Sequence, residues 1–63
     1  MLYSFNTGGY IDSGDLFQLL KQESLPINHV TYDRGLCFVE TTSFLSDEQK
    51  QFVENKINEL MVI

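Results

Sequence analysis

The sequence has few of the residues that usually stabilise very small proteins. Its 63 residues include one cysteine, one histidine, one proline and no tryptophan. The single cysteine, Cys37, excludes an internal disulfide, and His29 and Cys37 alone do not supply the ligands of a structural zinc site. The chain is long enough for one domain, residues 1–63, with a limited core. We therefore expect self-association to supply part of its stability.

Basic residues are also scarce. Nine acidic residues stand against four basic ones, which gives a net charge of −5. The basic residues Lys21, Arg34, Lys50 and Lys56 are scattered, whereas proteins that bind nucleic acids cluster them against phosphates. The negative net charge and the scattered basic residues argue against nucleic acid and anionic membranes as partners. It favours solubility, or attraction to a basic protein.

Long apolar runs are missing too. No stretch approaches the ~20 residues that a membrane span requires. The opening residues, MLYSFNTGGY, lack the basic start and the long apolar segment of a signal peptide. Together with the lone thiol, these features predict a cytoplasmic location and no membrane partner.

What the sequence does contain is clear secondary-structure patterning, first in its N-terminal half. In residues 1–6 one face would carry Met1, Tyr3 and Phe5, and the other Leu2, Ser4 and Asn6. This period of two, with aromatic residues on one face, predicts a strand. Residues 12–24 carry an apolar stripe at helical spacing, with Asp12 or Ser13 as the N-cap. Pro26 prevents the helix from continuing past the preceding residue.

A hairpin is predicted over residues 27–33 and 36–42, which are rich in β-branched and aromatic residues. We expect residues 33–35 to form a three-residue loop with Gly35 in the left-handed conformation. In that register one face is the core face, formed by Val30, Tyr32, Leu36 and Phe38. The opposite face then carries His29, Thr31, Cys37, Val39 and Thr41.

A second helix is predicted over residues 46–61, where Ser46 and Gln49 fit a capping box. Residues 61–63 either finish this helix or add a short strand. The resulting order is strand, helix, strand, strand, helix. It predicts an α+β domain with a three-stranded mixed sheet of order 1-3-2 and both helices on one face. This arrangement resembles a truncated ferredoxin-like topology, and the resemblance carries no functional inference.

Two surfaces of this predicted fold lack cover. The first strand is an unpaired edge, and the sheet face opposite the helices is open. Tyr10 lies in a loop, where exposed tyrosines often anchor interfaces. The predicted interface candidates are Tyr10, His29, Thr31, Cys37 and Val39.

Candidate chemical groups are few. His29 and Cys37 are expected as diagonal neighbours on one face, so a thiol activated by imidazole is conceivable, but a third group and a cleft are not evident. The acidic pairs Asp12/Asp15 and Asp47/Glu48 fit helix capping better than a calcium site. The glycines before Asp12 match no nucleotide-binding motif. We predict no catalytic, metal or cofactor site.

Three functions follow from these features. The first is a small acidic protein-interaction module without catalytic activity, forming a homo-oligomer through its sheet edge or open sheet face. The second is an acidic inhibitor or DNA mimic, of viral or mobile-element origin, that binds a basic protein surface. The third is a small thiol-based enzyme or sensor that uses Cys37 and His29.

Overall fold

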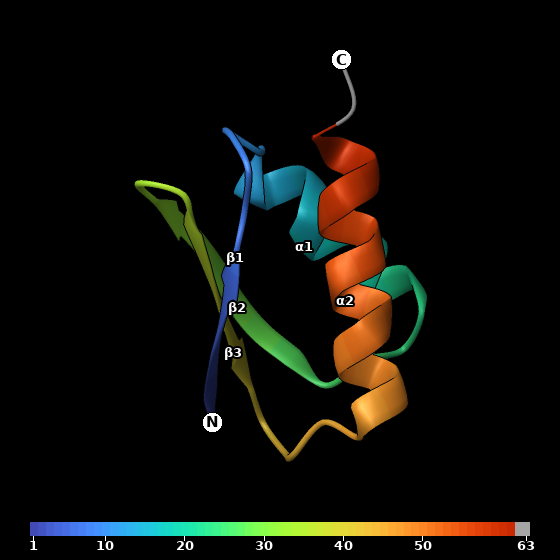
Figure 1. Cartoon of the computed structure of the whole chain (residues 1–63). Helices are drawn as coiled ribbons and strands as arrows, with labels where there is room; N and C mark the ends of the chain where they lie inside the picture. Colours follow the sequence, from blue (N-terminus) through green and yellow to red (C-terminus); the bar gives the residue numbers. More distant parts are fainter. Residues whose placement is uncertain (62–63) are drawn as a thin grey trace.

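The computed structural model describes residues 1–61 and confirms the predicted α+β fold. The strands β1 (Leu2–Asn6), β2 (Ile27–Asp33) and β3 (Leu36–Thr41) form one sheet in the order β1-β3-β2. The helices α1 (Ser13–Gln22) and α2 (Asp47–Leu60) lie on the same side of the sheet (Figure 1). Within residues 1–61, the other side of the sheet has no covering layer.

The sheet is antiparallel throughout, so the prediction of a mixed sheet is wrong in this respect. β1 and β2 each pair antiparallel with β3. They are therefore parallel to each other, but β3 lies between them and the two parallel strands share no hydrogen bonds.

Both helices begin at the capping residues that the sequence indicates. The Asp12 carboxylate accepts hydrogen bonds from the backbone N–H groups of Gly14 (2.8 Å) and Asp15 (3.2 Å). Ser46 and Gln49 form the predicted capping box, with reciprocal bonds of 3.1 Å and 2.8 Å. These contacts satisfy N–H groups that have no partner within the helix.

The helices end differently. α1 closes with Ser24 in a left-handed conformation, φ 63°. The Ser24 N–H donates to the Lys21 carbonyl (3.0 Å), and the Leu25 N–H donates to the Leu20 carbonyl (3.3 Å). This is a Schellman motif, which turns the chain towards β2 just before Pro26. At α2, Met61 is the C-cap; Val62 and Ile63, the rest of the predicted ending, lie outside the described residues.

The core lies between the sheet and the two helices. Leu16 and Leu20 of α1 and Val53 and Ile57 of α2 are almost fully buried. They recur at intervals of four residues, which keeps them on one side of each helix. The other buried hydrophobic residues come from the strands and loops: Phe5, Ile11, Leu25, Ile27, Val30, Cys37, Val39 and Leu45.

The β2–β3 hairpin differs from its predicted register by one residue. Gly35 is left-handed as predicted (φ 82°), but Arg34 is left-handed as well (φ 51°), and Asp33 lies opposite Leu36. The loop therefore has two residues, because two successive positive φ angles are the geometry of a type I′ turn. The predicted three-residue loop is wrong.

This one-residue shift reverses the two faces of β3. Val30 and Tyr32 lie on the helix side as predicted, but they face Val39 and Cys37. The predicted core residues Leu36 and Phe38 lie on the open face instead. A shift by one residue has this effect because successive side chains in a strand point to opposite faces.

Candidate interaction surface

The five predicted interface residues do not share one surface. His29 and Thr31 are exposed on the open face of the sheet, as predicted. Cys37 and Val39 are fully buried on the helix side, so their predicted place on the open face is wrong. The reason is the two-residue turn, which shifts β3 by one residue relative to β2.

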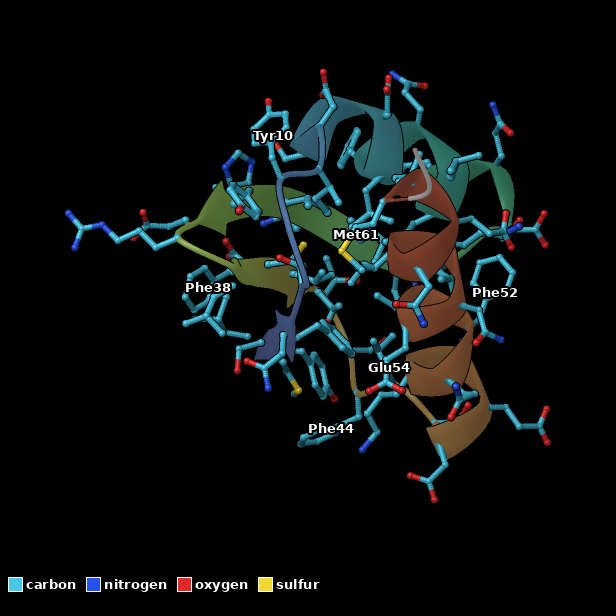
Figure 2. The ribbon with its side chains drawn as sticks, turned by 45° about the horizontal axis from the view of Figure 1, so that its top comes forward. Tyr10, Phe38, Phe44, Phe52, Glu54 and Met61 are labelled. Carbon is cyan, nitrogen blue, oxygen red and sulfur yellow. The ribbon has the colours of Figure 1, made fainter. Side chains whose placement is uncertain are left out.

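The open face carries three rows of side chains across the strands. Each row runs from β1 through β3 to β2, and the rows are Leu2–Glu40–His29, Ser4–Phe38–Thr31 and Asn6–Leu36–Asp33. Phe38 lies in the central row and points away from the helices (Figure 2). Six of the nine side chains are polar or charged, a composition that tolerates water. This face is therefore a mixed surface and not a bare apolar layer.

The outer edge of β1 forms a second candidate surface. A groove of about 350 Å³ runs between this edge and α2, lined by Ser4, Phe5, Asn6, Glu54 and Asn58. Figure 2 shows Glu54 on the side of α2 that faces β1. Nothing in residues 1–61 pairs with this edge of β1. The groove thus combines free strand backbone with a carboxylate and an amide from a helix.

The edge of β2 is less regular. The pairing of β2 with β3 is interrupted between Ile27 and His29. The Lys21 ammonium lies 3.5 Å from the Ile27 carbonyl, and the charged Asp33 ends the strand. Bulges, lysines and other charges are the devices by which proteins prevent an edge strand from pairing with another chain. β1 has none of these features.

The loop between β1 and α1 holds Tyr10, a residue that is 73 % exposed. It contacts Tyr32 edge to face, with the ring centroids 5.2 Å apart. In the first turn of α1, directly after this loop, a Cβ added at Gly14 would lie 3.1 Å from the Asp12 carboxylate. Glycine at position 14 therefore makes room for the cap on α1, an explanation that the sequence alone does not provide.

Cys37 and His29 are not brought together. Cys37 faces the core, whereas His29 lies on the open face opposite Glu40. Desolvation by burial raises the pKa of the Cys37 thiol to about 11. A raised pKa keeps the thiol protonated at neutral pH and opposes nucleophilic chemistry. The predicted diagonal pair of His29 and Cys37 is therefore wrong.

Metal and membrane sites receive no support from the described part of the chain. Residues 1–61 contain no group of three or more His, Cys, Asp or Glu side chains placed to hold a metal ion. Asp12 caps α1, and Asp47 and Glu48 lie in the first turn of α2, where the helix dipole favours negative charge. Neither described helix has the length and hydropathy needed to cross a membrane.

Several exposed apolar residues were not singled out by the sequence. Leu2 is 68 % exposed at the N-terminal end of β1, and Phe44 is 78 % exposed in the loop before α2. Alternation along residues 1–6 places Leu2 on the open face, but no periodicity reports the exposure of Phe44, because it lies outside any helix or strand. The sequence also did not predict that Glu54 lines the groove between β1 and α2 (the β1 groove), since this depends on how α2 packs beside β1.

The chain matches no protein-family model, no curated protein and no solved structure at a level that indicates a relationship.

Proposed function

We propose that this protein is a small acidic interaction module without catalytic activity, which forms a homo-oligomer through its sheet edge or open sheet face. The observation that carries the proposal is the edge of β1, which is unpaired within residues 1–61 and has no charge, proline or bulge. Such an edge offers free backbone donors and acceptors to another strand. The small core gives self-association a stabilising role as well.

The lone thiol supports a reducing, cytoplasmic location for this module. Its surface would be presented to other proteins rather than to nucleic acid, because the net charge of −5 repels phosphates. Tyr10, His29 and Thr31 remain the exposed candidates for contacts with a partner.

A second candidate function has a specific observation in its favour. A groove of about 610 Å³ lies where the end of α1 meets the start of α2, and Glu23, Glu48, Leu25 and Phe52 are among its lining residues. Two carboxylates beside the apolar side chains of Leu25 and Phe52 suit a basic segment with an apolar side chain. This groove supports the second candidate function, an acidic inhibitor that binds a basic protein surface.

Sedimentation equilibrium from low micromolar to near-millimolar concentration tests the first proposal. We expect the mass to rise from the 7.3 kDa of one chain towards a multiple of it. A single-chain mass over the whole range would contradict the homo-oligomer. Added salt separates the two candidates, because it weakens binding to a basic partner but does not weaken self-association of an acidic chain.

A further inference from the structure

We propose that β1 pairs antiparallel with β1 of a second copy, centred on Ser4, so that the two sheets become one continuous sheet. This inference rests on the proposed interaction function and names the surface and the partner. The partner is a second copy of this chain, and the contact is made mainly by backbone groups of Leu2, Ser4 and Asn6.

The hydrogen bonds at both ends of β1 show which backbone groups are free. The Met1 N–H group and carbonyl both bond to Thr41 (2.7 Å each), and the Thr7 N–H donates to the Gly35 carbonyl (2.8 Å). In an antiparallel pair the residues that exchange backbone bonds alternate with those that do not. Odd-numbered residues of β1 therefore bond to β3, whereas Leu2, Ser4 and Asn6 direct their N–H and carbonyl groups outward.

These outward groups are self-complementary. When Ser4 lies opposite Ser4 of a second copy, Leu2 lies opposite Asn6, and each outward N–H meets an outward carbonyl. Both copies then use the same surface, which is the condition for a closed twofold dimer. A shift by one residue would place outward groups against residues that are already bonded to β3, so this register is favoured over its immediate neighbours.

Charge selects β1 among the possible contact surfaces. The segment LYSFN contains no acidic or basic residue. By contrast, the open face carries Asp33 and Glu40, so stacking two open faces would bring four carboxylates together. For a chain with a net charge of −5, a second copy therefore meets less repulsion at the edge of β1 than at the open face.

One carboxylate does lie beside this contact. Glu54 lines the β1 groove together with Ser4, so the two Glu54 side chains of a dimer centred on Ser4 approach each other. At a separation of roughly 10 Å in water, two such charges weaken association about twofold. Salt or the change Glu54→Gln removes this repulsion. We therefore expect a dimer that tightens with salt.

The first test compares Ser4→Pro with Ser4→Thr. Proline removes the outward N–H of Ser4, which has no strand partner within residues 1–61, and edge strands tolerate proline at such positions. We expect Ser4→Pro to weaken the dimer at least about tenfold through the loss of central hydrogen bonds. Ser4→Thr keeps the N–H and should leave dimerisation nearly unchanged. Circular dichroism and thermal unfolding check that both variants are folded.

The second test probes the register directly and does not depend on the proline variant folding. In a bonded antiparallel pair the Cα atoms lie about 5.5 Å apart and the Cβ atoms about 5 Å apart, within easy reach of a short reagent that joins two thiols. Ser4→Cys should therefore form a covalent dimer when treated with a short bis-maleimide. Thr31→Cys, equally accessible on the open face, is the matched control and should not. The native Cys37 is buried and does not compete.

The outcomes separate this inference from the broader proposal. Dimers that survive Ser4→Pro and cross-link through Thr31→Cys would overturn β1 pairing but leave self-association intact. A wild-type protein that stays monomeric at all concentrations would overturn both. The β1 contact is supported when salt tightens the wild-type dimer and Glu54→Gln tightens the dimer at low salt. Weakening of the wild-type dimer by salt contradicts it.

Discussion

Arg34 and Gly35 both have positive φ angles, 51° and 82°, and together they form the whole turn between β2 and β3. Glycine adopts this conformation freely, but a side chain such as that of arginine disfavours it. The Arg34 guanidinium lies 3.9 Å from the Asp33 carboxylate, and both side chains are highly exposed. Such an exposed ion pair contributes little stability. It therefore does not offset the conformational strain that the positive φ angle of Arg34 places on the turn.

Arg34→Asn should stabilise the protein, because Asn-Gly is the preferred pair for a type I′ turn. We expect a gain of about 0.5–1 kcal/mol in the free energy of unfolding. Gly35→Ala should cost about 1–2 kcal/mol. An added Cβ at Gly35 would lie 3.7 Å from the nearest atom, the Thr7 carbonyl oxygen, so the loss reports backbone strain and not a clash. Urea denaturation measures both; a neutral Gly35→Ala would contradict this account of the turn.

The same turn shows how far the sequence predicts the sheet. The order and type of the elements, the strand order and both N-caps follow from periodicity, capping residues and chain topology. The register of β3 does not, because Asp33-Arg34-Gly35 and Arg34-Gly35 are both reasonable loops. Leu36 and Phe38 are as apolar as Cys37 and Val39, so hydrophobicity could not decide which pair is buried.

The candidate surfaces, too, could be predicted from the sequence only in part. The unpaired edge of β1 follows from the predicted strand order. The groove beside it could not be predicted, because Glu54 and Asn58 come from the opposite end of the chain and reach β1 through the packing of α2. Their four-residue spacing places them on one face of a helix, but it does not say which element that face approaches.

Ser24 offers a second test of backbone strain. It lies at the left-handed position that follows α1, where glycine is the usual residue. Ser24→Gly should raise the free energy of unfolding by about 1 kcal/mol. For a domain of this size, that gain corresponds to about 4–8 °C in Tm. Ser24→Ala is the matched control and should give no increase, since it keeps the Cβ. Equal effects of glycine and alanine would contradict the role of the positive φ.

Asp12 and Gly14 should be energetically coupled. Alanine at position 14 would gain about 1 kcal/mol of helix propensity over glycine, but its Cβ would lie 3.1 Å from the capping carboxylate of Asp12. We expect Gly14→Ala to stabilise the Asp12→Ala variant more than it stabilises the wild type. A double-mutant cycle in urea measures the difference. Equal effects in the two backgrounds would show that Gly14 does not serve the cap.

Thiol labelling tests the position of Cys37. Because the side chain is fully buried and its pKa is raised to about 11, alkylation of the folded protein near neutral pH should be far slower than in denaturant. The exposed variant Thr31→Cys, made in a Cys37→Ala background, provides the reference rate for an accessible thiol on the same sheet. Labelling of native Cys37 at that reference rate would place the thiol on the surface and contradict the observed register.

The raised pKa of Cys37 also predicts a loss of stability at high pH. Its pKa lies at about 11 in the folded protein, above the ordinary value of 9.0. Between these values the unfolded chain releases the thiol proton more readily, so the stabilisation is present below pH 9 and declines as the pH rises towards 11. We expect a decline of about 2 kcal/mol across this interval. Urea denaturation of the wild type and of Cys37→Ala from pH 8 to 11 isolates the effect, since the two proteins differ only in the side chain at position 37. The variant should be less stable at pH 8 but lose less stability on going to pH 11, and parallel pH profiles would contradict the prediction.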